Sequence, residues 1–135
     1  MITDFPLDFS GFAKTWKPNQ FLALPPGFAA RQKPDMDSPV FTANVETVRA
    51  ALLAVIAAQP RTSAARQAGG QIETVQRTAL LRFPDTVTAM PVDLGDGRSS
   101  VCMFSRSKYG IRDFNVNETR VRQWLELLAA RLATA

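Results

Sequence analysis

The residues best suited to chemistry gather in residues 105–120, where a strand-like run passes into a strongly helical C-terminus. Together with one arginine earlier in the chain, this stretch supplies cationic, carboxylate and amide side chains. The candidate ligand-binding residues are Arg77, Arg106, Lys108, Asp113, Asn117 and Arg120. A helix N-terminus offers backbone N–H groups and the positive end of the helix dipole. Arginines beside such a terminus therefore predict a site for a phosphate, sulfate or carboxylate group.

A structural interpretation of the same residues stays open. In this interpretation Asp113 and Asp85 pair with the arginines, and the cluster fixes the corner between strand and helix, because polar networks also help to specify a fold. We expect Asn117 to be the N-cap of the C-terminal helix. We also expect Asp113 to accept hydrogen bonds from Arg106 or another arginine of the cluster, which would favour the charged form of this carboxyl.

The composition argues against most catalytic chemistry. The chain has no histidine, and Cys102 is its single cysteine. The commonest general base near neutral pH is therefore missing, and neither an internal disulfide nor a zinc site of thiolates can form. Cys102 lies within a predicted strand, where an inert buried thiol is expected. Ser107 stands beside Lys108, but a Ser–Lys pair needs a desolvated lysine. We expect no enzymatic activity, no metal and no cofactor.

The distribution of charged and apolar residues limits the classes of partner that the protein can have. The net charge of +4 is too small and too scattered to indicate a nucleic acid. The longest apolar stretch, residues 50–58, is far shorter than the roughly 20 residues of a membrane-spanning helix. Residues 1–5 lack the basic start and apolar run of a signal peptide. These features predict a cytoplasmic protein that binds a small anionic ligand or a protein partner; the alternative is membrane association through a partner.

Residues 1–41 predict an extended arm that packs on a single α+β domain formed by residues 42–135. Frequent prolines in the arm forbid a long helix, and its aromatic residues argue against disorder. If these aromatic side chains are exposed, the arm becomes a docking surface for another protein. Docking through the arm is therefore the alternative to the main hypothesis, in which a small anionic or amphipathic ligand binds near the strand-to-helix corner.

The central part of the chain predicts an antiparallel sheet. Four strands are expected over residues 62–68, 71–81, 86–94 and 98–106, separated by turns at Gly69-Gly70, residues 83–85 and residues 95–97. Within the third strand, Pro91 predicts an edge position or a bulge. Residues 44–58, with Asn44 or Thr42 as N-cap, and residues 117–134 predict amphipathic helices. Each helix has one apolar stripe, so a two-layer α+β fold with both helices on one face of the sheet is expected.

Three stretches of the chain resemble the bacterial domain of unknown function 1499 family. They are Pro18-Asn19-Gln20-Phe21-Leu22 with Pro25-Pro26-Gly27; Val75-Gln76-Arg77-Thr78-Ala79-Leu80 with Arg82-Phe83-Pro84-Asp85; and Ser105-Arg106-Ser107-Lys108-Tyr109-Gly110 with Asp113-Phe114, Val116-Asn117 and Arg120-Val121. The third stretch departs from the family pattern at Lys108, Arg112, Asn115 and Glu118, and lysine in place of arginine loses bidentate geometry. The resemblance implies a compact α+β domain with no assigned activity.

Overall fold

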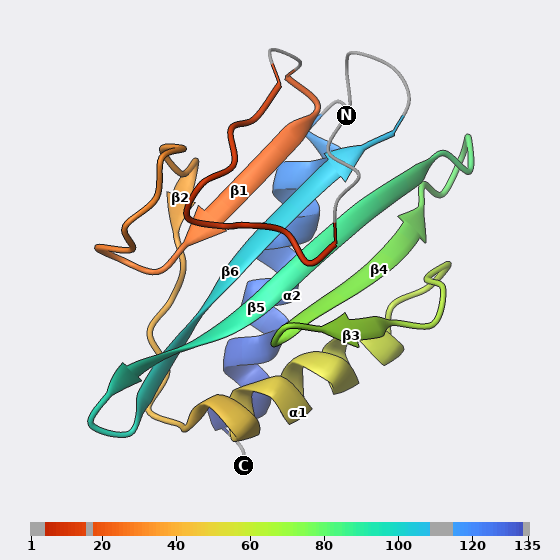
Figure 1. Ribbon diagram of the computed structural model, residues 1–135. Coiled ribbons are helices and arrows are strands. Elements are labelled where there is room, and N and C mark those ends of the chain that lie inside the picture. Colours follow the sequence, from red (N-terminus) through yellow and green to blue (C-terminus); the bar gives the residue numbers. More distant parts are fainter. Residues whose placement is uncertain (1–4, 16–17, 109–114, 134–135) are drawn as a thin grey trace.

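The computed structural model describes residues 5–15, 18–108 and 115–133. In these residues one open sheet of six strands packs against two helices (Figure 1). The strands are β1 (Gln20–Leu24), β2 (Met36–Asp37), β3 (Arg66–Ala68), β4 (Gln71–Arg77), β5 (Pro84–Gly95) and β6 (Arg98–Ser107), and the helices are α1 (Val45–Ala57) and α2 (Val116–Ala133). The strand order is β2-β1-β6-β5-β4-β3. Every neighbouring pair is antiparallel except β1 and β2, so the sheet is mixed.

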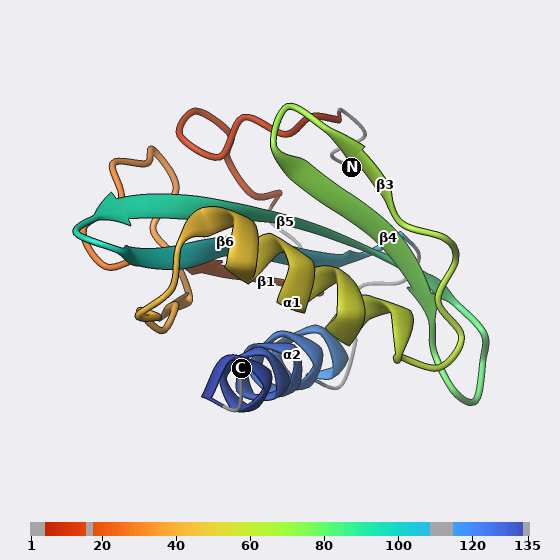
Figure 2. The same ribbon diagram turned by 90° about the horizontal axis from the view of Figure 1, so that it is seen from below.

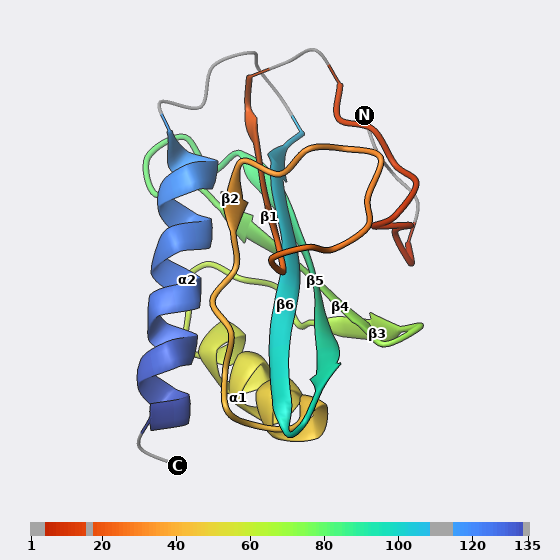
Figure 3. The ribbon, with the colours of Figure 1, turned by 90° about the vertical axis from the view of Figure 1, so that its left-hand side faces the viewer.

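The α+β class, the four antiparallel strands β3 to β6 and the two helices agree with the prediction. Both helices lie on the same face of the sheet, and residues 5–15 cross the opposite face (Figures 2 and 3). The prediction of about four strands was incomplete, because β1 and β2 come from residues 1–41. β1 is an interior strand between β2 and β6. Its short apolar run is flanked by Pro18 and Pro25, and the frequent prolines of this region predict only an extended arm.

Two strand boundaries differ from the prediction. The strand expected over residues 62–68 begins at Arg66, although Thr62 still forms an isolated bridge with Gln76. The strand expected over residues 71–81 ends at Arg77, so the following apolar residues belong to a turn. Other local expectations are confirmed. Gly69 and Gly70 have φ of 57° and 78° in the β3–β4 turn, a conformation that glycine adopts without strain.

The positions of Pro91 and Asn44 also match their sequence signals. Pro91 pairs with Val101 on β6, whereas the ladder between β5 and β4 stops at Ala89. Pro91 therefore has a neighbouring strand on one side only, as a residue without a backbone N–H requires. Asn44 is the N-cap of α1, and its side chain accepts a 2.8 Å hydrogen bond from the backbone N–H of Thr47.

Apolar side chains fill both faces of the sheet. The helix-facing cluster combines Val48, Leu52, Val121, Trp124 and Leu128 of the helices with Phe21, Ile72, Val87, Val101 and Met103 of the strands. The opposite cluster combines Leu22, Leu24, Cys102 and Phe104 with Leu7 and Phe9 of the N-terminal arm. Successive side chains along β6 alternate between the two clusters, which is the strand periodicity. The arm therefore completes a second apolar layer over the face that the helices leave open.

Candidate functional site

A buried ion pair lies between β5 and the first turns of α2. Arg120 Nη2 is 2.9 Å from Asp85 Oδ2, and the two side chains are 5% and 1% exposed. The Nε of Arg120 donates to Oε1 of Gln76 on β4, and Gln76 Nε2 donates to the carbonyl oxygen of Pro60. The guanidinium thus joins α2 to β4 and β5. The side chain of Gln76 extends this connection to the loop after α1. This network ties the first turns of α2 to the sheet.

Asn117 belongs to the same network and does not have the role that its position predicted. Helix α2 begins at Val116, so Asn117 lies in the first turn and the prediction that it is the N-cap is wrong. Its fully buried amide accepts hydrogen bonds from Ser105 Oγ at 2.6 Å and Arg120 Nη1 at 2.9 Å, and donates to the carbonyl oxygen of Asn19 and to Ser107 Oγ. Asn117 therefore ties the helix to β6 and to the residue before β1.

The side chain of Arg106 lies on the face of the sheet that the N-terminal arm covers, opposite to the helices. It follows Phe104 by two residues on β6, and its guanidinium carbon is 4.9 Å from the centre of the Phe104 ring. Its Nη1 donates to Thr88 Oγ1 at 2.9 Å and to the carbonyl oxygen of Phe104 at 3.1 Å, while its Nε is buried without a hydrogen bond. Burial lowers the pKa of Arg106 to about 10, and the negative charge of Glu73 opposes this shift. Arg106 and Arg120 consequently do not share one site.

Two other predicted site residues, Arg77 and Lys108, lie at the same end of the sheet as Arg120. Arg77 is exposed at the end of β4, where its Nη1 donates to the carbonyl oxygen of Arg82 at 2.9 Å. Lys108 is exposed just after β6, and its backbone N–H donates to Pro84 O at 3.3 Å. Asp113 is outside the described residues, so the expected hydrogen bonds to this carboxyl stay a prediction. The carboxylate that pairs with Arg120 is Asp85.

A cleft opens beside the ion pair, between the end of β4, the loop after α1 and the first turns of α2. It has a volume of about 450 Å³, and its lining includes Arg61, Arg77 and Arg120. Thr119 and Gln123 add polar side chains from α2, both exposed. The Nε of Arg61 donates to the carbonyl oxygen of Arg77 at 3.0 Å, which holds two of the arginines side by side. In the described part of the chain neither Arg61 nor Arg77 forms an ion pair.

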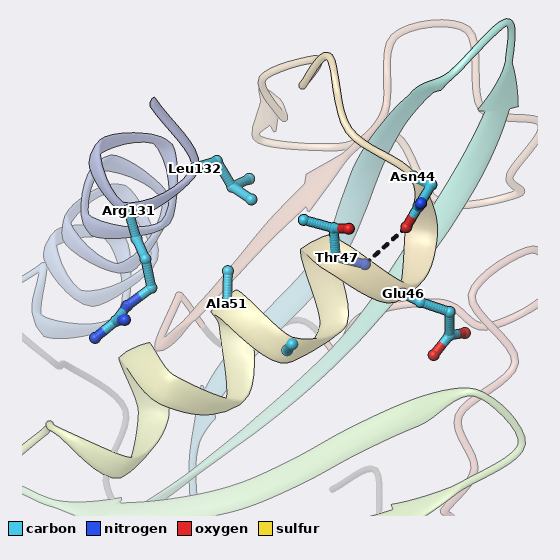
Figure 4. Close-up of a pocket in the computed structure, with 7 residues that line it drawn as sticks. Asn44, Glu46, Thr47, Ala51, Arg131 and Leu132 are labelled. Atoms are coloured by element: carbon cyan, nitrogen blue, oxygen red, sulfur yellow. Dashed lines mark hydrogen bonds between the residues drawn. The ribbon is translucent and has the colours of Figure 1, made fainter. Parts of the chain in front are cut away.

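A second cleft lies between the start of α1 and the end of α2 (Figure 4). Its volume is about 530 Å³, and it is lined by Glu46 and Thr47 on α1 and by Arg131 and Leu132 on α2. The backbone N–H of Thr47 is already bonded to the Asn44 side chain. One carboxylate and one guanidinium balance each other there, so this cleft has less reason to attract an anion than the one beside Arg77.

Two further predictions concern Cys102 and the arm. Cys102 is fully buried in β6, and burial raises its pKa to about 12, as expected of an inert thiol. Phe9 is 2% exposed, while Phe12 and Phe28 pack partly buried against the same cluster. The exposed aromatic patch required for docking through the arm is thus absent from residues 5–15 and 18–28. Trp16 lies outside the described residues.

Comparison with known proteins places the chain in a family. The model of a family described as a protein of unknown function (DUF1499) matches residues 14–128. The chain belongs to the DUF1499 family. Neither a curated protein nor a solved structure matches it. The matched region of this DUF1499 protein contains the whole Arg120 network and the cleft beside it, but it leaves out Leu7 and Phe9 of the arm.

Within the described ranges, the DUF1499 chain has neither a cluster of metal ligands nor a membrane-spanning helix. No group of three or more His, Cys, Asp or Glu side chains there could hold a metal ion. No helix in those ranges has both the length and the apolar character needed to cross a bilayer.

Sequence reasoning missed Arg61 and did not place Gln76 in the site. Arg61 stands alone between Pro60 and Thr62, and an isolated arginine in a polar loop carries no pattern. Its φ of 60° turns the chain toward β4, a conformation that the sequence did not indicate. Gln76 follows Ile72 and Thr74 at intervals of two residues along β4, and this period could have shown that it shares the helix-facing side with Ile72.

Proposed function

We propose that this DUF1499 domain binds a small anionic ligand in the cleft lined by Arg61, Arg77 and Arg120. The observation that carries the proposal is the convergence of three arginines, from a loop, a strand end and a helix, on one cleft of about 450 Å³. The Asp85 carboxylate balances Arg120. Arg61 and Arg77 therefore supply the positive charge for the ligand. Guanidinium groups bind phosphate, sulfate and carboxylate strongly because their N–H donors match the oxygen geometry of these anions.

The lining also indicates the size and character of the ligand. Small-molecule sites commonly enclose about 300–1,000 Å³. Besides the arginines, Pro60, Ala79 and Val116 line the cleft. An amphipathic molecule with an anionic group and a short apolar part would therefore use the lining more fully than a bare anion. The proposal is for binding without a chemical step, because the chain has no histidine and the described lining of the cleft includes no aspartate, glutamate, lysine or cysteine.

The experiment is a nuclear magnetic resonance titration with inorganic phosphate and with a short alkyl phosphate. We expect saturable shifts of backbone signals around residues 59–61, 76–79 and 116–123, with tighter binding of the alkyl phosphate. Arg61→Gln and Arg77→Gln should each weaken binding about tenfold, the scale of one lost charge-assisted contact. Arg98→Gln is the matched control, because Arg98 is an exposed arginine at the opposite end of the sheet.

The outcomes separate a specific site from general attraction to a cationic protein. If Arg98→Gln weakens binding as much as Arg77→Gln does, the attraction is unspecific and the cleft is not the site. If neither phosphate gives saturable shifts at low salt, the proposal fails. Arm docking is not favoured by the same structure, because Phe9 and its aromatic neighbours pack against the sheet.

A further inference from the structure

The turn between β4 and β5 presents large apolar side chains to solvent. Leu80 is 88% exposed, Leu81 62% and Phe83 42%. We call residues 78–83 the apolar turn. The other exposed large apolar side chains among the described residues are Val40 and Leu127, which stand singly at 43% and 40%. Isolated exposed apolar residues are common, whereas a group of them marks a surface that contacts a partner or a membrane.

Hydrogen bonds hold the apolar turn in one conformation. Within it, the backbone N–H of Thr78 donates to the carbonyl oxygen of Phe83 at 2.9 Å, and the N–H of Phe83 donates to Thr78 Oγ1 at 3.0 Å. The N–H of Arg82 donates to Thr78 O at 3.1 Å, and Arg82 has a φ of 59°. The bonds close the turn at its base and leave the two leucines at its tip. The two leucines are therefore exposed because these hydrogen bonds hold the turn in a conformation that places them at its tip.

Among the described residues, the exposed charges nearest to the apolar turn are cationic. Arg77 and Arg82 flank the leucines, and Lys108 follows β6 beside Pro84, at the same end of the sheet. The carboxylate of Asp85 is 1% exposed and pairs with Arg120, so it contributes little negative potential at the surface. Further away, Glu118 pairs with Arg122 at 2.9 Å.

The turn at the other end of β5 provides an internal contrast. There the chain reverses through Gly95-Asp96-Gly97, which has no apolar side chain and carries one carboxylate. Both turns connect the same kind of antiparallel pair, so reversing the chain does not require leucines. Figure 1 shows the two turns at opposite ends of the long β5 ribbon.

We propose that the apolar turn docks this protein on the surface of an anionic membrane. Leu80 and Leu81 enter the boundary between headgroups and acyl chains, and Arg77 and Arg82 contact lipid phosphates. The charges favour an anionic membrane as the partner. Exposed cations beside a narrow apolar tip complement the anionic headgroups and the apolar interior of such a bilayer. A flat protein interface of ordinary size needs a much broader surface than this tip. Interfacial docking does not require a spanning helix. The proposal shares Arg77 with the anion cleft, but it rests on Leu80 and Leu81, which do not line that cleft.

The test is flotation of the full chain with vesicles of phosphatidylcholine alone or with about 30% phosphatidylglycerol. We expect binding to the anionic vesicles to be at least about tenfold tighter than to the neutral ones and to weaken with salt. Leu80→Ser with Leu81→Ser should reduce binding to anionic vesicles at least about tenfold, whereas Leu127→Ser should not. Arg82→Gln should weaken binding, and Arg98→Gln should leave it nearly unchanged.

A second measurement places the turn in the bilayer. Leu80→Cys can be labelled with an environment-sensitive fluorophore, because the native Cys102 is buried. We expect a blue shift on anionic vesicles and quenching by brominated acyl chains. The same label at Arg98→Cys should show neither effect.

Other results of these experiments would overturn the proposal or assign the turn to another partner. Equal binding to both vesicle types, or loss of binding in Leu127→Ser, would overturn the proposal. A Leu80→Ser, Leu81→Ser protein that binds vesicles like wild type but no longer forms a dimer would assign the turn to self-association instead. Because both leucines are exposed, these variants should fold, and circular dichroism checks that they do. Inorganic phosphate binding to the cleft, measured on the same variants, should be unchanged whichever way the vesicle result falls.

Discussion

Asp85 on β5 and Arg120 on α2 form an ion pair of 2.9 Å that is almost completely removed from solvent. The pair is the only one among the described residues in which both partners are buried. Its environment compensates for the removal from water, because Gln76, Ser105 and Asn117 supply further hydrogen bonds to the guanidinium. A buried pair of this kind contributes little when intact, but the loss of one partner leaves an uncompensated charge.

The first prediction is that Asp85→Ala lowers the free energy of unfolding by about 3–5 kcal/mol, the usual effect of stranding a buried charge. The double variant Asp85→Leu with Arg120→Met should be less destabilised than the sum of the single variants, because no charge is then left alone. Denaturant unfolding followed by circular dichroism measures both. Glu118→Ala, which breaks an exposed pair with Arg122, should change stability by at most about 1 kcal/mol. Equal effects of Asp85→Ala and Glu118→Ala would contradict this account.

The second prediction compares two asparagines. Asn117→Ala should destabilise the protein by about 1–3 kcal/mol, because it removes the buried hydrogen bonds that the amide donates to the backbone oxygen of Asn19 and accepts from Ser105 Oγ and Arg120 Nη1. Asn44→Ala should cost about 1 kcal/mol, the usual loss for an exposed N-cap. Thermal and chemical unfolding of the two variants give the comparison. A larger loss for Asn44→Ala would mean that the Asn117 network adds little.

The third prediction concerns Arg106, whose Nε is buried without a hydrogen bond. Arg106→Met should cost less than about 1 kcal/mol at pH 7, because methionine keeps the apolar contact with Phe104 and removes a desolvated charge. The pKa of Arg106 falls from 12.5 to about 10 through burial. Between these values the folded protein releases a proton that the unfolded chain keeps. The wild type should therefore gain stability over Arg106→Met as the pH rises from about 10. A pH-independent difference up to pH 11.5 would refute the burial effect.

The fourth prediction concerns Cys102, whose pKa burial raises to about 12. The folded protein should not react with a disulfide reagent at pH 9, where an exposed thiol is largely ionised. Addition of guanidinium chloride should expose one reactive thiol per chain. The yellow thiolate released by Ellman's reagent reports both states. Rapid reaction without denaturant would show that β6 is accessible.

The sequence predicted the parts of the fold that local patterns control. The helical stripe at Val121, Trp124 and Leu128 and the glycines of the β3–β4 turn act through their neighbours in the chain, so their positions could be read directly. β1 could not be found this way. Five residues between prolines give no decisive period, and their place in the sheet depends on pairing with β6, which lies far along the chain.

The candidate site was predicted in composition but not in geometry. Arg106 and Arg120 are both in the polar stretch, yet strand alternation sends Arg106 to the arm-facing side, while α2 delivers Arg120 to the other side. A pattern of residue types cannot show which face a side chain occupies until the strand register is known. The turn at Leu80 was missed for a related reason, since the sequence predicts a strand through residue 81, whereas β4 ends at Arg77 and the following turn exposes Leu80.

Because β1 is an interior strand that pairs with β6, the order in which the chain is synthesised delays the completion of the sheet. β1 pairs with β6, and the amide of Asn117 bonds to the backbone of Asn19 across 98 residues of chain. During translation Gln20–Leu24 is made before its antiparallel partner β6, and β2, α1, β3, β4 and β5 lie between them in the chain. Contacts of such long range close slowly. A nascent chain therefore carries Gln20–Leu24 without its antiparallel partner until β6 has been made, and a ribosome-bound chaperone could shield this apolar strand during that interval.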